Sequence, residues 1–281
     1  MKPRSRPRRT LASMLRLALI AYGCWCALLW MMQRSMLYLA IAAGTPMPDA
    51  LLATSIQRFN VGETGQTAAW LLRPEQPGSF PLAVFFHGNA ELIDHCLEDA
   101  RSWQARGYAV LMCEYRGYGR SGGSPSQQAL VDDALEALAI ASAQADIDVS
   151  RLVLHGRSLG TGVAAQVAAA LATPPSLIVL ESPFVSVASF SWRYGVPPLL
   201  VRDTYRTDEA LLGLRDVPVL IVHGRDDEVV GFAHGVALHA LLPTSTLVEL
   251  HGAGHGALSV LPEYGAAIDV AVRDVDWGRT K

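Results

Sequence analysis

The sequence predicts an α/β fold, with a mostly parallel sheet and helices on both of its faces. Short continuous apolar runs alternate with longer helical segments along most of the 281 residues, as in strands that are buried on both sides. Loops rich in glycine and polar residues follow several of these runs, where parallel sheets gather their chemistry. Half of the chain is apolar and only 17% is charged, which argues against disorder and supplies one sizeable core.

The N-terminus predicts a membrane anchor. Residues 1–10 hold Lys2 and four arginines, and residues 11–32 are apolar except for Arg16. This stretch is long enough to cross a bilayer, and Arg16 lies near its start, where the side chain can reach the headgroups. The cationic flank favours a cytoplasmic N-terminus, with the following domain on the periplasmic or another extracytoplasmic side.

A cleaved signal peptide is the rival interpretation of this segment. Arg8-Arg9 resembles a twin-arginine signal, and Ala40-Ile41-Ala42 resembles a cleavage site. Against cleavage, the apolar run is long and ends in Gln33-Arg34 rather than in small residues. With the anchor retained, residues 33–54 are expected to be a linker and residues 55–281 a single folded domain.

The domain is expected to contain eight strands and at least four helices. The expected strands are 56–61, 67–72, 82–87, 109–113, 152–154, 177–180, 217–222 and 246–250. The expected helices are 91–106, stopped by Gly107, then 126–145 with Ser126 as its N-cap, 163–172, and 266–277. This alternation brings the loops that follow the parallel strands to one edge of the sheet.

The most informative motif follows the fifth expected strand. It is Gly156-Arg157-Ser158-Leu159-Gly160, and an alanine-rich helix comes after it. A Gly-x-Ser-x-Gly between a strand and a helix is a nucleophile elbow, in which a tight turn exposes the serine hydroxyl and the glycines allow close packing. Without that context the motif would be weak, because glycine and serine are common in turns. The context favours Ser158 as a nucleophile over Ser158 as a simple helix N-cap.

A serine nucleophile needs a base, and the base needs a carboxylate that orients it. Asp226 and Asp227 follow the seventh expected strand, while His251 and His255 follow the eighth. His251 comes directly after its strand and is expected to be packed or hydrogen-bonded. His255 lies in a glycine-rich loop that can reach over the sheet to Ser158. The residues alone leave the choice between the two aspartates open.

The chain resembles the α/β-hydrolases over nearly its whole length, and in particular the membrane-anchored serine hydrolases of the α/β-hydrolase-domain type. The resemblance implies an α/β-hydrolase fold, and the family spacing His-Gly-x-x-Asp selects Asp227 as the orienting carboxylate in a triad with Ser158 and His255. It also extends to serine-aminopeptidase-like members. Besides the elbow, it is carried by 33–38 (Gln-Arg-Ser-Met-Leu-Tyr), 87–90 (His-Gly-Asn-Ala), 115–121 (Tyr-Arg-Gly-Tyr-Gly-Arg-Ser), 223–227 (His-Gly-Arg-Asp-Asp) and Gly254-His255.

An oxyanion hole needs two backbone N–H groups. Leu159, the residue after the nucleophile, supplies one, and the loop after the third expected strand supplies the other. Asn89 and Ala90 both lie in that loop, and Asn89 is favoured. The segment 184–214 is expected to form a small cap over the pocket. Its aromatic residues either line an acyl site or only pack the cap; they are Phe190, Trp192, Tyr194 and Tyr205.

These expectations describe a membrane-anchored serine hydrolase that cleaves a small-molecule ester or thioester through an acyl-enzyme. An amide or peptide hydrolase is the runner-up, and a non-catalytic binding protein on the same fold is a further alternative. Residues 160–165 also fit the dinucleotide-binding pattern G-x-G-x-x-A, with Glu181 as its acid, but they fall inside a helix and cannot cradle a pyrophosphate.

No cofactor or metal is expected, because no His-Glu-x-x-His is present and the dinucleotide pattern is misplaced. With a net charge of −3, the chain is not expected to bind nucleic acid. Its four cysteines do not predict a disulfide framework. The sequence leaves the oligomeric state, the substrate and its acyl length open.

Overall fold

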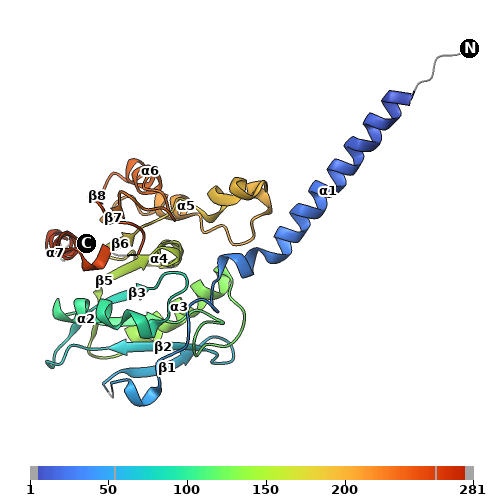
Figure 1. Cartoon of the computed structure of the whole chain (residues 1–281). Helices are drawn as coiled ribbons and strands as arrows, with labels where there is room; N and C mark the ends of the chain where they lie inside the picture. Colours follow the sequence, from blue (N-terminus) through green and yellow to red (C-terminus); the bar gives the residue numbers. More distant parts are fainter. Residues whose placement is uncertain (1–5, 54, 257, 276–281) are drawn as a thin grey trace, which may run out of the picture.

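A mostly parallel sheet of eight strands forms the centre of the computed structural model, which describes residues 6–53, 55–256 and 258–275 (Figure 1). Lys2 and Arg4 of the basic segment and Trp277 of the last expected helix lie outside these residues. The strands are β1 (Gln57–Val61), β2 (Thr67–Leu72), β3 (Phe80–Phe86), β4 (Ala109–Cys113), β5 (Ile147–Arg157), β6 (Leu177–Glu181), β7 (Val219–Gly224) and β8 (Ser245–Leu250).

The strands follow the order β1-β2-β4-β3-β5-β6-β7-β8, in which β1 and β2 pair antiparallel and all strands from β4 to β8 run parallel. Every residue of β3, β4, β6 and β7 is buried, which is why these strands read as continuous apolar runs. The expected α/β fold with a mostly parallel sheet is confirmed.

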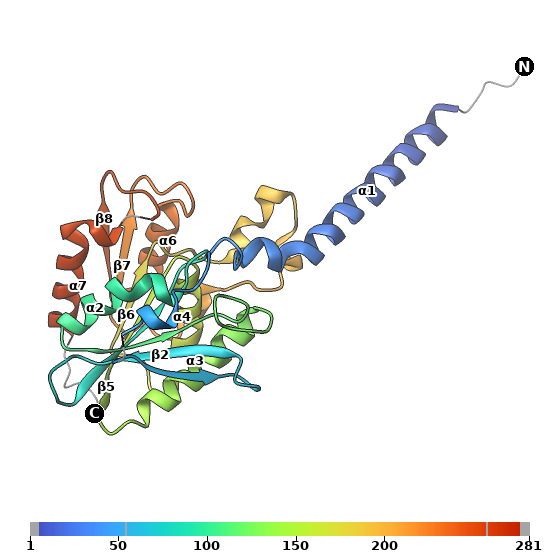
Figure 2. The ribbon, with the colours of Figure 1, turned by 60° about the horizontal axis from the view of Figure 1, so that its bottom comes forward.

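Helices cover both faces of this sheet (Figure 2). The α-helices are α1 (Arg6–Leu37), α2 (Leu97–Ala105), α3 (Gln127–Ser142), α4 (Leu159–Ala170), α5 (Thr207–Leu212), α6 (Ala233–Leu241) and α7 (Pro262–Asp274). Short 3₁₀ helices are η1 (Asp49–Leu51), η2 (Ile93–Cys96), η3 (Val187–Tyr194), η4 (Pro198–Leu200) and η5 (Leu258–Val260). Side chains of α3, α4, α5 and α6 share one buried cluster, and those of α2 and α7 share the other.

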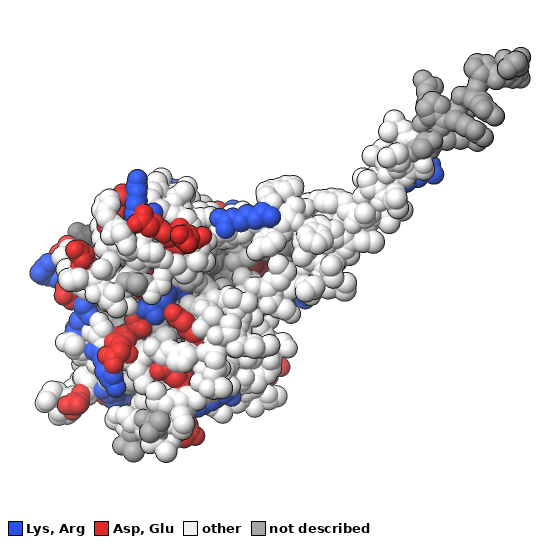
Figure 3. Space-filling view, viewed as in Figure 1, with Lys and Arg blue, Asp and Glu red and all other residues white. Residues whose placement is uncertain are grey.

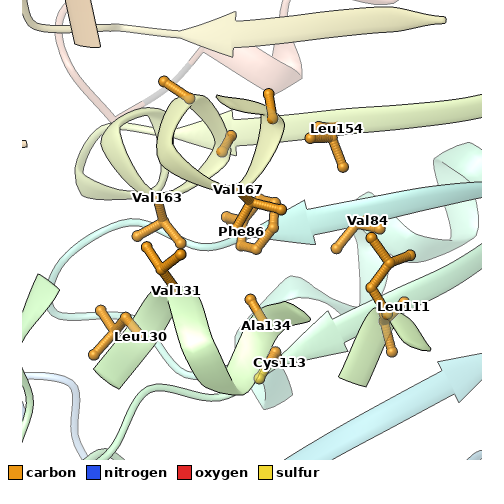
Figure 4. Close-up of a cluster of buried hydrophobic side chains, with 14 of the residues drawn as sticks. Val84, Phe86, Leu111, Cys113, Leu130, Val131, Ala134, Leu154, Val163 and Val167 are labelled. Carbon is orange, nitrogen blue, oxygen red and sulfur yellow. The ribbon is translucent and has the colours of Figure 1, made fainter. Parts of the chain in front are cut away.

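Small side chains allow α3 and α4 to pack closely on the sheet (Figure 4). Ala134 of α3 lies beside Cys113 of β4, and Val167 of α4 lies over Phe86 at the end of β3, with Val163 one turn away on the same helix (Figure 4). All five side chains are at most 2% exposed. Burying an aliphatic side chain of this size contributes about 1.5–3 kcal/mol, so this layer holds α4, the helix that follows the elbow, firmly against the end of β3.

The structure differs from the expected elements in several places. Two helices begin four residues earlier than expected, α4 at Leu159 and α7 at Pro262. The fifth strand is longer than 152–154 at both ends: β5 continues to Arg157, and it begins at Ile147, where Asp148, Ser150 and Arg151 interrupt the apolar run and the register with β3 is irregular. The expected helix 91–106 is divided into η2 and α2. The helix α6 was not anticipated. The N-cap is confirmed, since the Ser126 hydroxyl accepts a hydrogen bond from the N–H of Ala129 at 3.2 Å.

The expected anchor 11–32 lies inside the single long helix α1. The part Leu11–Leu37 is long and apolar enough to cross a membrane, judged by length and composition. The second half of α1 runs beside η3 and η4 (Figure 1), with hydrogen bonds from Tyr22 to the carbonyl of Gly195 (3.0 Å) and from Trp25 to that of Tyr194 (2.9 Å). The cap segment is therefore docked on the helix.

Part of the segment expected to be a linker is packed into the domain. Arg34 forms two hydrogen bonds with Asp203, at 2.7 and 3.1 Å. Tyr38 is buried, and its hydroxyl lies 3.1 Å from that of Tyr205. Ala43 is buried as well. The chain between α1 and β1 is thus fixed at several points to the cap and to the sheet.

Candidate active site

Ser158 lies at a sharp turn between β5 and α4, with φ of +49° and ψ of −115°. A positive φ is rare for a residue with a side chain, and the surrounding backbone enforces it here. The N–H of Ser158 donates to the carbonyl of Glu181 at 2.9 Å. A Cβ on Gly160 would lie 2.1 Å from the carbonyl oxygen of Phe86, and one on Gly156 would lie 2.3 Å from that of Gly160. Both glycines are needed for the turn to fit.

A chain of hydrogen bonds joins the three residues predicted as a triad. The Ser158 Oγ atom lies 2.8 Å from Nε2 of His255, and Nδ1 of His255 lies 2.8 Å from Oδ2 of Asp227. Because an ionised carboxylate can only accept, a neutral His255 carries its proton on Nδ1 and presents the lone pair of Nε2 to the hydroxyl. The residues come from loops after β5, β7 and β8, at the carboxyl ends of the parallel strands.

Asp227 is held by more groups than His255 alone. Its Oδ1 atom accepts hydrogen bonds from the N–H groups of Val229 and Val230, at 2.9 and 2.8 Å. The Nε2 atom of buried His223 lies 3.3 Å from Oδ2. Burial alone would raise the pKa of Asp227, but hydrogen bonds from His223, His255 and Val230 lower that pKa well below its usual range. The carboxylate is therefore ionised and fixed in place, and the second histidine beside it was not anticipated.

The two alternative residues lie apart from this chain of hydrogen bonds. Asp226 is exposed, and its backbone N–H donates to the carbonyl of Ala253 at 3.0 Å. His251, expected to be packed or hydrogen-bonded, is exposed directly after β8. The geometry thus brings Asp227 and His255, and neither Asp226 nor His251, to Ser158. The catalytic roles of the three residues remain predictions.

Two backbone N–H groups beside Ser158 are available for an oxyanion. Within the described parts of the chain, neither the N–H of Asn89 nor that of Leu159 has a hydrogen-bond partner, and both residues line the pocket with Ser158. The N–H of Ala90 is already bonded to Oδ1 of Asn89 at 3.1 Å. This engagement favours Asn89 over Ala90 as the second donor, in the role predicted for it.

The side chain of Asn89 connects the oxyanion loop to the chain that follows α1. Its Nδ2 atom donates to the carbonyl of Leu37. Its Oδ1 atom accepts from the N–H of Leu39 at 2.9 Å and from the hydroxyl of Tyr118 at 2.7 Å. Sequence reasoning gave Asn89 only a backbone role, because partners fifty residues away in the chain leave no local signal.

Replacing Asn89 with alanine is expected to lower kcat by about 10- to 100-fold, because the loop that carries an oxyanion donor loses its fixed position. The backbone N–H itself remains, so KM for a short ester is expected to change little. Steady-state kinetics on p-nitrophenyl butyrate measure both constants. The matched control is Asn60→Ala on exposed β1. Equal kcat values for the two variants would show that the Asn89 side chain does not position the donor.

A buried polar network lies under the elbow. The Arg157 guanidinium contacts Glu181 at 3.0 Å and Asp99 at 2.6 Å, and the Tyr264 hydroxyl donates to Glu181 at 2.9 Å. Burial would raise the pKa of Glu181, but Arg157, His155 and Tyr264 lower it to about 2. Glu181 is therefore a structural partner of Arg157, which accounts for the acid that also fitted the dinucleotide pattern.

An apolar cavity of about 490 Å³ lies above Ser158, a volume within the range of small-molecule sites, about 300–1,000 Å³. The sheet loops form its floor, while the cap and α1 form its walls. Among the aromatic residues of the expected cap, Phe184, Phe190 and Tyr194 line it, whereas Trp192 is 63% exposed. The walls comprise Leu29, Trp30, Gln33, Met36, Leu37, Leu39, Phe184, Val187, Phe190, Ser191, Arg193, Tyr194, Val196, Leu200, Val201 and Asp203.

Comparison with known proteins identifies the family. A family model described as serine aminopeptidase, S33, matches residues 81–202. The α/β hydrolase domain-containing protein WAV2 of Arabidopsis thaliana is 35% identical, over 66% of this chain and 67% of its own length. The lysophosphatidylserine lipase ABHD12 of Danio rerio is 32% identical, over 66% of this chain and 53% of its own.

Among solved structures, the esterase RhEst1 from Rhodococcus sp. ECU1013 resembles the chain with a TM-score of 0.61 at 21% identity, over 79% of this chain and all of the esterase. At that identity the likeness shows the fold alone. The relatives found by sequence support a hydrolase. Together with the sheet order and the elbow, they show that this chain belongs to the α/β-hydrolase superfamily.

Proposed function

We propose that the protein is a serine hydrolase that cleaves a carboxylic ester or thioester through an acyl-enzyme formed on Ser158. The observation that carries this proposal is the continuous chain of hydrogen bonds from Asp227 through His255 to Ser158, at the floor of an apolar cavity. Such an arrangement activates a hydroxyl that is otherwise a poor nucleophile.

In the proposed mechanism the Ser158 oxygen attacks the substrate carbonyl while Nε2 of His255 takes the hydroxyl proton. Asp227 keeps the imidazole in the required tautomer and stabilises its cationic form. The N–H groups of Leu159 and Asn89 stabilise the oxyanion. His255 then gives the proton to the leaving alcohol or thiol, and a water molecule releases the acyl group by the same steps in reverse order.

The pocket favours an acyl substrate over the free amino terminus of a peptide, which is the runner-up. A protonated amine requires an unpaired acid, and the acids that line the described pocket are Glu91 and Asp203. Asp203 is paired with Arg34. Glu91 accepts the N–H of Gly88 at 2.8 Å and lies 3.6 Å from Arg157. The name of one relative found by sequence, a lysophosphatidylserine lipase, agrees with an ester.

The full-length protein in detergent provides the test. A fluorophosphonate probe is expected to label the wild type and not Ser158→Ala. The value of kcat/KM is expected to rise with acyl length along a series of p-nitrophenyl esters, and to exceed that for aminoacyl amides. Faster cleavage of the amides would favour the aminopeptidase alternative, and the absence of both labelling and turnover would favour a non-catalytic binding protein.

We further propose that α1 is a retained membrane anchor with a cytoplasmic N-terminus. Five cationic residues precede its apolar stretch and only Arg34 follows closely, as the positive-inside rule requires for this orientation. The hydrogen bonds of Tyr22, Trp25 and Arg34 to the cap are also contacts that cleavage near Ala42 would remove.

In a Gram-negative host, the full-length product is expected to resist carbonate extraction and to expose its C-terminal domain to protease added to spheroplasts. The apolar length of α1 provides the membrane affinity and the arginine cluster the orientation. Immunoblotting of a C-terminal tag measures both. A shortened product in the soluble fraction would contradict the anchor, and protection from the external protease would contradict the orientation.

A further inference from the structure

The contacts between α1 and the cap begin close to the cationic end of the helix. Tyr22, whose hydroxyl donates to the cap, lies thirteen residues beyond Arg9, which corresponds to about 20 Å of helix. The hydrocarbon core of a bilayer is about 30 Å thick. Shifting the span toward the N-terminus would place Arg9 and its neighbours in hydrocarbon, at about 2.5–3.5 kcal/mol each. A spanning α1 therefore meets the cap before it leaves the membrane.

Trp30 marks the expected outer boundary of the span. It lies twenty residues beyond Thr10, which corresponds to about 30 Å of helix. The guanidinium of Arg202 lies 4.9 Å from the centre of its ring, and tryptophan and arginine are typical of the membrane–water interface. Tyr22 and Trp25 then lie about 12 and about 8 Å below this boundary, near the depth of about 5–10 Å reached by interfacial segments.

The part of the cap that meets α1 has the composition of a membrane-contacting surface. Trp192, Tyr194 and Leu199, here called the cap face, are 63, 51 and 84% exposed. The carbonyls of Tyr194 and Gly195 are bonded to side chains of α1 and need no water. Figure 3 shows that the cap and the adjoining helix are largely uncharged on the side in view.

Two arginines of the cap are available to lipid phosphates. Arg193 and Arg202 are exposed, and neither has an acidic partner among the residues that the structure describes. Their guanidinium groups lie over the rings of Phe190 and Trp30, both at 4.9 Å. Long cationic side chains that pack on apolar surface and extend to headgroups are favoured at the edge of a bilayer.

Residues of α1 and of the cap also line the cavity above Ser158. Leu29 and Trp30 of α1 line the cavity above the nucleophile together with Phe190 and Tyr194 of the cap. We propose that the cap face inserts into the leaflet beside α1, and that the substrate is a bilayer amphiphile whose acyl chain enters the cavity from that leaflet. This inference rests on the proposed anchor and hydrolase function and specifies their substrate class.

Depth-dependent quenching in reconstituted vesicles tests the insertion. The full-length chain carries Cys24→Ser and Cys26→Ser, the remaining cysteines being buried, and a nitrobenzoxadiazole label on Leu199→Cys. Val149→Cys, 45% exposed near the opposite end of β5, is the matched control. In phosphatidylcholine–phosphatidylglycerol vesicles, lipids brominated on their acyl chains are expected to quench the label at 199 at least about fivefold more than the label at 149.

Quenching at 199 by aqueous iodide and not by brominated lipid would overturn the proposal, because the cap face would then lie in water. Shielding from both quenchers would also overturn it, since a second copy of the chain would then cover the face. Fluorophosphonate labelling of Ser158 in the same sample reports on the hydrolase function separately. Quenching by brominated lipid without fluorophosphonate labelling would support insertion of the cap face and contradict the proposed hydrolase function.

A functional variant gives an independent readout. Leu199→Asp places a charge in the leaflet without touching the cavity lining, and it is expected to reduce hydrolysis of a long-chain monoacyl glycerophospholipid in vesicles about tenfold. Its activity on soluble p-nitrophenyl acetate in detergent is expected to stay within about twofold of the wild type. Val149→Asp serves as the control. Equal loss on both substrates, or no loss on either, would contradict entry from the leaflet.

Discussion

Replacing Ser158 with alanine is expected to lower ester turnover by about four to six orders of magnitude, leaving only the contributions of binding and of the oxyanion donors. The hydroxyl is the atom that bonds to His255, and no other hydroxyl is bonded to that imidazole among the described residues. Single-turnover and steady-state assays with a p-nitrophenyl ester measure the loss.

Folding is expected to survive this change, because alanine occupies the same strained backbone position and the packing of Gly156 and Gly160 is retained. Circular dichroism of the variant checks this point. Ser150→Ala is the matched control, since its hydroxyl bonds only to Asp148 at the far end of β5. Near-normal activity in the Ser158 variant would end the proposed mechanism.

Replacing Asp227 with asparagine is expected to reduce kcat by about 10⁴-fold, because an amide no longer fixes the His255 tautomer or stabilises its cation. Asp226→Asn, a change of identical chemistry one residue away, is expected to alter kcat less than about twofold, since that side chain is exposed. A larger loss in the Asp226 variant would show that the orienting carboxylate has been assigned to the wrong residue.

The pH dependence of kcat/KM tests whether Asp227 stays ionised in the active enzyme. The hydrogen bonds around Asp227 hold its pKa well below the usual range, so the carboxylate stays charged as the pH falls through the ordinary aspartate value of about 4. Asp227 is therefore not expected to contribute to the acid limb of kcat/KM.

The identity of the base is tested by comparing His255→Ala with His251→Ala. The first substitution is expected to abolish turnover and the second to leave it intact.

The parts of the site that could be predicted from sequence are those with a local physical requirement. Gly156 and Gly160 are adjacent to Ser158 in the chain, and the turn tolerates nothing larger. The central strands β3, β4, β6 and β7 could be predicted because burial on both faces demands continuous apolar runs. The positions of Asp227 and His255 followed from the family spacing and from the order of residues after β7 and β8.

Other features depend on contacts between distant segments. His223 ends up beside Asp227 because a buried imidazole donates to the carbonyl of Val230 at 2.8 Å, a pairing that no periodicity indicates. The bonds of Asn89 to residues 37 and 39 join segments about fifty residues apart. Because β5 begins with polar residues, the first half of that strand could not be predicted from its hydrophobic pattern. In each case hydrogen bonding made across the fold, rather than local preference, determined the outcome.

The hydrogen bonds between Asn89 and the chain after α1 make two properties depend on one short stretch. These are the attachment of the domain to its helix and the position of the oxyanion loop. A protease that cut between Leu37 and Leu39 would separate the domain from the covalent tether of α1 and in the same event detach the Leu37 carbonyl, one of the groups that restrain the oxyanion loop. Shedding would therefore act as an off switch. For protein production, a soluble form that begins at β1 should be a poor surrogate, whereas one that begins before Arg34 keeps both Asn89 partners and the contact with Asp203.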